Sequence, residues 1–422
     1  MAKQQFQNVR GMPDILPEVA VKFNYLIDLF RQLAADAGYE PIEVPIAEDK
    51  NVFIRSVGSG TDIVDKEMYV LPDRSGNELA LRPEPTAGVV RAYLQHGMSS
   101  RPQPVRLQVA GPMFRYDRPQ AGRQRQFTQV GVEVLGESSP SVDAQIISLA
   151  LRYYKKLNLT NFSLQINSIG DNTCRPKYRR ALVDYFNEHK KDLCETCRGR
   201  LKTNPLRILD CKEKSCQKII DEAPQTLNYL CKPCQDHFSG VLEYLDTLGI
   251  TYELNPRLVR GLDYYNRTVF EFYGEREGSQ SSLGGGGRFD GLAEALGGKP
   301  VAAAGFGLGI ERLILELEEK GIQLPTRPKL KVFVASLGEP ARLQAFTLIE
   351  QLLDSGIGTV GTVDKDSIGG QLEKANKTGV PYAIIIGQKE VKEETVILRD
   401  MRSGAQEMIP VGGVIKELHK RV

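Results

Sequence analysis

Residues 111–136 read GPMFRYDRPQAGRQRQFTQVGVEVLG, and the N-terminal part of the chain is organised around them. The pattern predicts two strands joined by a long basic loop. The first strand ends at residues 113–115, the loop covers 116–126, and the second strand covers 127–135. Successive side chains of a strand point to opposite faces. One face of the second strand is therefore apolar core, and the other carries polar side chains.

The polar face of this second strand indicates a ligand site. Gln129 and Glu133 lie on it with Gly131 between them, and a glycine there leaves room for a ligand against the backbone. Arg115 closes the neighbouring strand. An arginine beside an amide and a carboxylate can bind a phosphate and an amine in one cleft. The alternative is an ordinary amphipathic hairpin with a solvated basic loop.

Length and composition indicate a globular protein of several domains. The 422 residues exceed one hydrophobic core and predict two or three domains. A hydrophobic content of 41%, a charged content of 26% and a net charge of +2 are ordinary, and the net charge does not indicate a nucleic-acid partner. We find no apolar run long enough to span a bilayer and no secretory signal, so we expect a cytoplasmic protein without a membrane partner.

The N-terminal segment predicts a helix followed by an edge strand. After Pro17, apolar residues recur at helical spacing: Val19, Phe23, Leu26, Phe30, Leu33 and Ala37. Gly38 then ends the helix. Residues 39–46, YEPIEVPI, read as a strand whose two prolines place it at an edge or a bulge.

A rigid turn follows the short strand predicted at 79–82. Residues 83–86 read PEPT, and Thr86 could cap a helix over 87–95. Glu84 and Thr86 would then place a carboxylate and a hydroxyl on a stiff turn, where they could hold an ammonium group. A simple helix cap is the alternative.

Six of the seven cysteines fall between residues 194 and 234, in or next to the most basic part of the chain. Residues 175–218 hold 13 Lys and Arg against 6 Asp and Glu, a net charge of +7. Two CxxC pairs can form a tetrahedral zinc site, here from Cys194, Cys197, Cys231 and Cys234. Cys211 and Cys216 lie between the pairs. The alternative is a set of reduced thiols in a small helical insertion.

Three later stretches carry glycines, arginines and tyrosines. Residues 258–272, LVRGLDYYNRTVFEF, combine a turn at Arg260 with a strand. Residues 282–292, SLGGGGRFDGL, let backbone approach a ligand closely, with a flexible loop as the alternative. Residues 302–317, AAAGFGLGIERLILEL, predict a glycine-spaced strand and then a helix that bears Arg312. A dinucleotide-binding reading of these glycines fails because no βαβ unit precedes them.

The C-terminal part predicts a separate domain. Residues 325–328, PTRP, read as a linker. Strands are expected at 331–336, 357–363, 382–387, 395–400 and 405–410, with helices at 342–355, 368–377 and the C-terminus. This alternation is typical of a small α/β domain with a mixed sheet. Its net charge of +1, from 13 Lys and Arg against 12 Asp and Glu, does not indicate RNA binding.

Together these motifs resemble those of class II aminoacyl-tRNA synthetases, and specifically the histidyl-tRNA synthetase family. Residues 114–136 match the pattern FRxxRPQxGRxRQFxQxGxExxG of motif 2, and residues 302–317 resemble motif 3. The peptide that begins at residue 258 is peculiar to this family and its paralogues. The resemblance covers nearly the whole chain. The sequence departs from the family at Pro85, Thr128 and Phe289, where relatives commonly carry Gly, His and Tyr.

The resemblance implies a role for each matching residue. Arg260 and Arg115 would be the catalytic arginines at the reacting carboxylate and α-phosphate. Histidine contacts are implied for Glu84, Pro85, Thr86, Gln129, Glu133, Tyr264 and Tyr265. ATP contacts are implied for Arg115, Arg123 and Arg312. Mg²⁺ would be held mainly through the nucleotide, without dedicated metal ligands from the protein.

The resemblance also implies the architecture and the partners. An α+β catalytic domain with an antiparallel sheet would cover residues 1–326, with a small helical insertion at about 172–245. An α/β anticodon-binding domain would cover residues 328–422. The N-terminal helix and strand resemble motif 1, the dimer interface, and so imply a homodimer. The implied partners are ATP, L-histidine and tRNA(His).

The implied activity is histidine–tRNA ligation through a histidyl-adenylate. One alternative is a non-catalytic, histidine-binding regulatory paralogue of histidine biosynthesis. Such paralogues typically lack the C-terminal domain, which this chain has. A second alternative, an RNA-binding scaffold, is disfavoured by the complete set of ATP motifs.

Overall fold

The computed structural model describes residues 6–58, 61–275, 282–326, 329–361 and 367–421. It divides into two compact units, Met1–Pro325 and Thr326–Val422. Part of the linker expected at 325–328, and the end of the strand expected at 357–363, lie outside the described residues.

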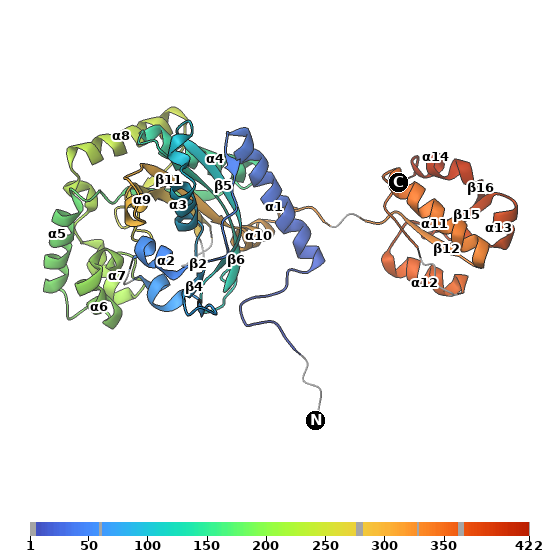
Figure 1. Ribbon diagram of the computed structural model, residues 1–422, viewed down its shortest axis with the longest axis horizontal. Coiled ribbons are helices and arrows are strands. Elements are labelled where there is room, and N and C mark those ends of the chain that lie inside the picture. Colours follow the sequence, from blue (N-terminus) through green and yellow to red (C-terminus); the bar gives the residue numbers. More distant parts are fainter. Residues whose placement is uncertain (1–5, 59–60, 276–281, 327–328, 362–366, 422) are drawn as a thin grey trace, which may run out of the picture. The chain divides into compact units, whose positions relative to one another are not determined.

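An eight-stranded sheet forms the centre of the first unit (Figure 1). Its strands, in spatial order, are β1 (Glu40–Pro41), β5 (Val105–Phe114), β6 (Gln126–Leu135), β11 (Ala303–Gly309), β10 (Ser282–Arg288), β9 (Asn266–Gly274), β7 (Phe162–Ser168) and β8 (Glu253–Leu254). The six inner strands pair antiparallel, and only the two-residue edge strands β1 and β8 pair parallel. The predicted hairpin is confirmed as β5 and β6, and the antiparallel α+β fold class with it.

Long helices cover one face of this sheet. They are α1 (Pro17–Asp36), α4 (Pro140–Lys156), α8 (Lys232–Thr247) and α10 (Ile310–Glu319). The apolar face of β6 contributes Val130, Val132 and Val134 to the shared core, as its alternation predicts. The apolar stripe of α1 is confirmed in its middle, since Phe23, Leu26, Phe30 and Leu33 are buried. Val19 is exposed, and Ala37 lies just after the helix.

The strand expected at 39–46 is wrong in extent. Only Glu40 and Pro41 pair, with Leu107 and Gln108 of β5. A proline cannot donate to a ladder, so Pro41 and Pro45 limit pairing to this short edge.

The opposite face carries shorter elements. They are α2 (Lys50–Val57), η1 (Ile63–Glu67), α3 (Thr86–Gln95), η2 (Met98–Ser100), α9 (Leu292–Ala295) and a small sheet of β2 (Ala47–Asp49), β4 (Glu78–Leu81) and β3 (Val70–Pro72). Residues of β5, α3 and α9 share a second core with Tyr264, Tyr265 and Phe289. This core fixes both tyrosines, with Tyr265 beside Arg260.

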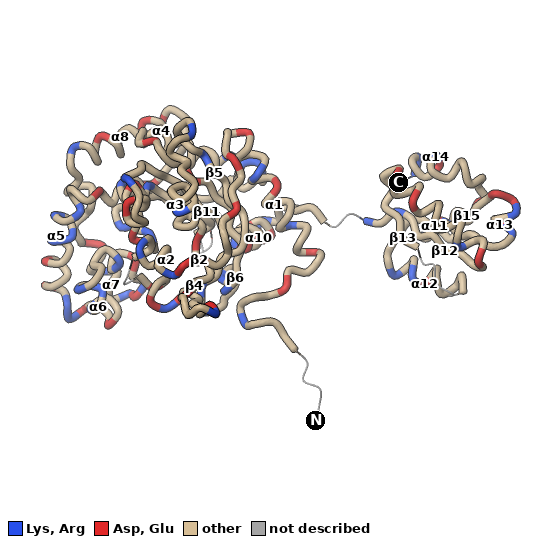
Figure 2. Tube along the Cα trace, in the orientation of Figure 1, with Lys and Arg blue, Asp and Glu red and all other residues tan. Residues whose placement is uncertain are grey.

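A helical insertion between β7 and α8 has its own small core. It comprises α5 (Arg175–Glu188), α6 (Glu195–Thr203), η3 (Pro205–Ile208), α7 (Lys214–Asp221) and η4 (Thr226–Tyr229). Figure 2 shows Lys and Arg spread along α5 and α6. The insertion therefore carries the basic charge that the sequence gathers there.

The second unit is a five-stranded mixed sheet in the order β13 (Thr359–Gly361), β12 (Val332–Ser336), β14 (Tyr382–Ile386), β15 (Thr395–Asp400) and β16 (Gln406–Pro410). The first three strands are parallel and the last two antiparallel, so the expected mixed α/β sheet is confirmed. Its helices are α11 (Glu339–Asp354), α12 (Ile368–Thr378), α13 (Gln388–Lys392) and α14 (Val414–Leu418), with the turn η5 (Val411–Gly413). The sequence pattern missed the short helix α13. Within the described ranges of the whole chain, we find no helix with the length and apolar character needed to cross a bilayer.

Candidate active site

Two adjoining cavities open beside the large sheet of the first unit. The smaller lies over β6, β10 and β11, and the larger lies mainly between the helical insertion and the edge formed by β7, β8 and β9. The larger has a volume of about 980 Å³ and the smaller about 230 Å³. Four arginines line both cavities: Arg115, Arg123, Arg260 and Arg312. These four come from the end of β5, the basic loop, the turn before β9 and the start of α10. A cleft with four guanidinium groups suits a ligand with several negative charges.

Arg260 is a buried cation held against one carboxylate. Its Nη1 lies 3.0 Å from Oε1 of Glu271, and its guanidinium carbon lies 5.7 Å from the ring centre of Tyr265. Burial alone lowers the pKa of Arg260, but the Glu271 carboxylate outweighs this and holds the pKa above its ordinary value. The Nε atom of Arg260 is buried without a protein partner. The guanidinium is thus permanently charged and has a donor left for a ligand.

The glycine run of β10 makes room for this arginine. A Cβ at Gly285 would lie 2.9 Å from Nη1 of Arg260 and 2.4 Å from the carbonyl oxygen of Phe270. Residues 282–288 form a strand of the central sheet, so the flexible-loop alternative for this part of the stretch is wrong. Glycine is needed here because side chain and backbone approach closely.

The other three arginines are held by main-chain oxygens and one carboxylate. Arg115 Nε donates to the Pro83 carbonyl at 2.9 Å, and Arg312 Nη1 donates to the Ser282 carbonyl at 2.8 Å. Arg123 pairs with Asp117. Burial lowers the pKa of Arg312, and the nearby Arg123 lowers it further. This mutual repulsion favours an anion in the cleft.

The PEPT turn presents Glu84 to the start of α3. The carboxylate accepts hydrogen bonds from the backbone N–H groups of Thr86 at 2.7 Å and Ala87 at 2.9 Å. Thr86 does not cap the helix as expected. Instead its hydroxyl donates to Glu133 Oε1 at 2.6 Å. Glu84 caps the helix instead, because its side chain reaches the free N–H groups of the first turn. Pro85 is the residue before the helix, with φ −88°.

Glu133 is a buried carboxylate with one free oxygen. Its Oε2 has no protein partner, and it lies where a Cβ on Gly305 would stand, 1.7 Å from that position. Burial raises the pKa of Glu133 well above its usual range, and the neighbouring Glu84 raises it further. Burial likewise raises the pKa of Glu84. Two buried carboxylates side by side favour a cationic ligand.

Gln129 and the two tyrosines lie near these two carboxylates. Gln129 lines the smaller cavity together with Arg260, and its Oε1 is buried without a partner. The Tyr264 hydroxyl donates to Glu84 at 3.2 Å, and its ring lies 4.7 Å from that of Tyr265. The structure therefore brings the predicted polar residues into one connected region. Gln129 Oε1, Glu133 Oε2 and Arg260 Nε have no protein partner, so each of them can bind a ligand.

Two of the three departures from the family pattern, Phe289 and Thr128, have local partners. Phe289 packs edge-on against Tyr264, with ring centres 5.7 Å apart. The Thr128 backbone N–H donates to Glu311 at 2.7 Å. Burial raises the pKa of Glu311 to about 7.

Sequence reasoning missed Glu271, the partner of Arg260. It also accepts a hydrogen bond from the Tyr273 hydroxyl at 2.6 Å and one from Ser282. The available signal was a single acidic residue within an aromatic strand, where Phe270 and Phe272 face the core. Such a residue on the other face needs a buried partner.

The predicted zinc set is wrong as a set. Cys194 and Cys197 lie with Cys211 and Cys216, whereas Cys231 and Cys234 lie with Cys174 and Asp171. The reason is topological: the first pair begins α6 inside the insertion, and the second begins α8, which returns to the catalytic sheet. Beyond these two groups, the described residues contain no further convergence of three or more such side chains.

Comparisons with known proteins fit this arrangement. Residues 11–313 match the family model described as histidyl-tRNA synthetase, and residues 331–421 match that of an anticodon-binding domain. The histidine–tRNA ligase of Pelotomaculum thermopropionicum is 47% identical over 98% of this chain and 97% of its own length. That of Dehalococcoides mccartyi strain 195 is 46% identical over 99% of this chain and 100% of its own.

Among solved structures, apo histidyl-tRNA synthetase of Staphylococcus aureus superposes with a TM-score of 0.81 at 35% identity, covering 98% of this chain and all of that one. An antiparallel sheet with glycines beside the cleft, followed by an anticodon-binding domain, is typical of a class II aminoacyl-tRNA synthetase. The matches over the whole length go further: the chain belongs to the histidyl-tRNA synthetase family.

Proposed function

We propose that this chain is a histidine–tRNA ligase, which activates L-histidine with ATP and transfers the histidyl group to tRNA(His). The observation that carries the proposal is the cleft itself, where four arginines line both cavities and Gln129 lines the smaller one. Glu133, on the same face of β6 as Gln129, lies buried with Glu84 nearby. The arginines suit a triphosphate, and the two carboxylates suit an ammonium group. The relatives named above carry the same activity in their names.

The arginines divide between the phosphates. Arg115 and Arg260 would lie at the α-phosphate, and Arg123 and Arg312 would contact the outer phosphates. Mg²⁺ would enter with the nucleotide, because phosphate oxygens supply most ligands of such ions. Glu271 lines both cavities and is the carboxylate best placed to approach it. The ion would neutralise charge on the phosphates.

The pocket proposed around Glu133 and Gln129 would hold the amino acid. Glu133 Oε2 and Gln129 Oε1 are acceptors without partners, so they would take substrate N–H groups. Glu84 is already bound by two backbone N–H groups and Tyr264, so it would add negative charge and hold the turn that carries Pro85 and Thr86. Tyr265 would close the pocket beside Arg260.

In the first step a histidine carboxylate oxygen attacks the α-phosphorus. The bond from the α-phosphorus to the bridging oxygen breaks, and its electron pair leaves with pyrophosphate. No side-chain nucleophile is required, so Arg260 and Arg115 act by positioning and by stabilising negative charge. In the second step the terminal ribose hydroxyl of the tRNA attacks the carbonyl carbon, AMP leaves, and the hydroxyl proton is lost.

The helical insertion and the C-terminal unit would bind tRNA. The proposal assigns residues 1–326 to catalysis, with the insertion at about 172–245 beside the acceptor arm, and residues 328–422 to the anticodon. The net charge of +7 over residues 175–218 suits phosphate contacts. The C-terminal unit has a low charge, so its role would depend on shape and on specific side chains.

We also infer a homodimer formed around the N-terminal segment. Large apolar side chains are exposed there: Phe6, Val9, Ile15, Leu16, Val19 and Tyr25. Such a group of apolar side chains is typical of a subunit interface. The double variant Leu16→Asp/Val19→Asp should sediment as a monomer. Leu343→Asp changes an equally exposed leucine of the second unit and should leave the dimer intact. A dimeric double variant would contradict this interface.

The regulatory alternative shares the fold. A Bacillus halodurans structure whose name joins an ATP phosphoribosyltransferase regulatory subunit with a histidyl-tRNA synthetase superposes with a TM-score of 0.64 at 24% identity. This likeness concerns the fold alone, whereas the relatives named as ligases match at 46–47% identity. Charging of tRNA serves protein synthesis, so the proposal places the protein in the cytoplasm. None of the seven cysteines forms a disulfide, which suits a reducing compartment.

Exchange of labelled pyrophosphate into ATP tests the proposal. Exchange should require histidine and should not occur with each of the other amino acids supplied alone. Histidine binding without any exchange would instead identify the regulatory paralogue.

A further inference from the structure

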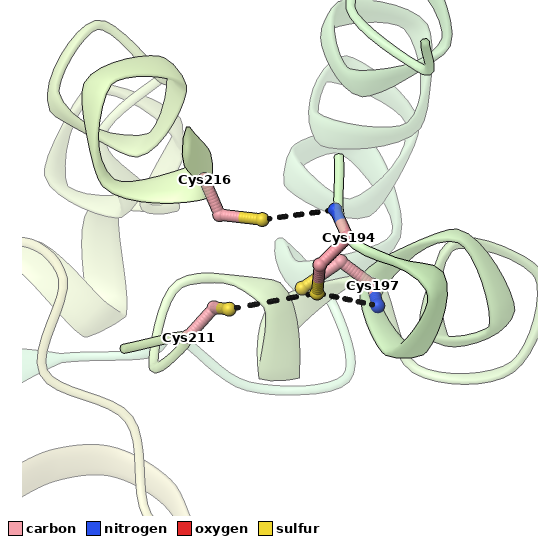
Figure 3. Close-up of side chains that lie close together, drawn as sticks. All are labelled: Cys194, Cys197, Cys211 and Cys216. Atoms are coloured by element: carbon pink, nitrogen blue, oxygen red, sulfur yellow. Dashed lines mark hydrogen bonds between the residues drawn. The ribbon is translucent and has the colours of Figure 1, made fainter. Parts of the chain in front are cut away.

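Four cysteines of the insertion lie close together. They are not the four cysteines that the sequence pattern predicted as a zinc site. We call Cys194, Cys197, Cys211 and Cys216 the tetracysteine cluster. Cys194 and Cys197 belong to the first turn of α6, Cys211 follows η3, and Cys216 lies in α7. Figure 3 shows their side chains pointing toward one another from these three segments.

The spacing of the sulfur atoms fits a tetrahedral metal site. All four Sγ atoms lie within 4.8 Å of one another, and those of Cys194 and Cys211 are 3.9 Å apart. Four sulfurs at about 2.3 Å from one Zn²⁺ ion stand about 3.8 Å from each other. The sulfur atoms of a disulfide would be about 2.05 Å apart. The cluster therefore has the dimensions of a tetrathiolate site.

The backbone around the cluster stabilises negative sulfur. The Cys197 N–H points at the Cys194 Sγ at 3.4 Å, and the Cys194 N–H points at the Cys216 Sγ at 3.2 Å. Such donors favour thiolates, the form that binds zinc. A zinc tetrathiolate carries two negative charges, and the surrounding segment with its net charge of +7 would offset them.

A set of ordinary core cysteines explains the cluster less well. Cys197 and Cys216 are fully buried, as apolar cysteines often are. Cys194 and Cys211, however, are half-buried and line the larger cavity. The helices α6 and α7 have nine and eight residues, and short helices with a small core need an additional cross-link.

The segment between the cysteines touches the catalytic turn. Arg200 pairs with Asp62 at 2.7 Å, and Asn204 donates to Asp263 at 2.9 Å. Arg207 Nη1 donates to the carbonyl oxygen of Arg260 itself at 3.2 Å. Cys197 and Cys211 flank this segment. An ion bound to both cysteines would therefore also hold the contacts of Arg200, Asn204 and Arg207 in place.

We propose that the tetracysteine cluster binds one structural Zn²⁺ ion as four thiolates, and that this ion holds segment 198–210 against the turn that carries Arg260. The ion takes no part in the reaction. It adds a cross-link to the small core of the insertion and joins the insertion to the cleft.

Metal analysis of single variants tests the site. The full chain, purified with reductant and without chelator, then incubated with Zn²⁺ and desalted, should retain about one ion at this site. Cys197→Ser should lose this ion. Cys234→Ser is the matched control, because it removes a buried thiol of the other group. No retained zinc, or an ion that persists in Cys197→Ser and leaves Cys234→Ser, would overturn the assignment.

Two measurements on the unaltered chain remove the dependence on variant folding. X-ray absorption should give a shell of sulfur atoms alone at about 2.3 Å, and a shell with nitrogen or oxygen would overturn the site. Amide hydrogen exchange should become faster after chelation both in residues 198–210 and in residues 258–263. Faster exchange confined to residues 198–210 would overturn the link to the catalytic turn.

Discussion

Replacing Arg260 by alanine removes the guanidinium on which the proposed chemistry depends most. Negative charge grows on the α-phosphate oxygens as the carboxylate attacks. A fixed cation beside that phosphorus stabilises the transition state more than the ground state, so it acts on kcat. Arg260 is prearranged for this, because Glu271 holds one end at 3.0 Å while Nε stays without a protein partner.

These contacts determine the loss of rate and of stability that we expect in Arg260→Ala. Loss of one prearranged donor costs about 10²–10³ in kcat, or about 3–4 kcal/mol. Stability should fall by less, about 1–3 kcal/mol, because Glu271 keeps hydrogen bonds from Tyr273 and Ser282. Arg260→Lys should recover only part of the rate, since an ammonium group cannot make a bidentate contact. Transfer from preformed histidyl-adenylate should suffer less than its formation.

Pyrophosphate exchange and thermal unfolding, measured on the same preparation, separate catalysis from folding. Arg91→Ala is the matched control: Arg91 pairs with Glu48 and lines neither of the two cavities. It should lower the melting temperature with little change in kcat. If Arg260→Ala behaves as this control does, Arg260 merely holds its turn and the catalytic assignment is refuted.

Three further perturbations test other parts of the account. Glu133→Gln should raise the KM for histidine roughly 10–100-fold, because an acceptor for a charged group is lost, and leave the KM for ATP nearly unchanged; an unaltered histidine KM would remove Glu133 from the pocket. A chain that ends at Pro325 should keep histidine-dependent exchange and charge tRNA poorly, and full charging would contradict the anticodon role. The pKa of Glu311 is about 7 in the folded chain and about 4.5 in the unfolded chain. The contribution of Glu311 to the free energy of unfolding is therefore complete below pH 4.5 and is lost as the pH rises through 7. The free energy of unfolding, measured with denaturant across this window, should therefore fall more steeply in the wild type than in Glu311→Gln; parallel curves would refute the shifted pKa.

Local patterns in the sequence predicted the parts of the fold that depend on periodicity. The alternation of β6 and the middle of the stripe of α1 placed their apolar residues correctly, because burial of one face decides both patterns; Val19, at the start of the stripe, is exposed. The strand expected at 39–46 was wrong because most of that segment has no neighbour to pair with. Pairing partners are a property of the whole sheet.

The candidate site likewise contains residues that the sequence predicted and residues that it did not. The resemblance to family motifs predicted Arg115, Arg260 and Arg312 as site residues, and the structure places them around one cleft. Glu271 could not be assigned, because its role depends on a partner eleven residues away across a turn. The cysteine pairs were misassigned for a related reason: spacing along the chain does not reveal that α6 and α8 carry their thiols to different places.

The most direct test of the account is charging of tRNA(His) by the full chain. With ATP, Mg²⁺ and histidine, the account predicts histidyl-tRNA at many turnovers per protein, dependent on each component and abolished or slowed about 10²–10³-fold by Arg260→Ala. A protein that binds histidine and ATP but forms no histidyl-tRNA would contradict the central claim.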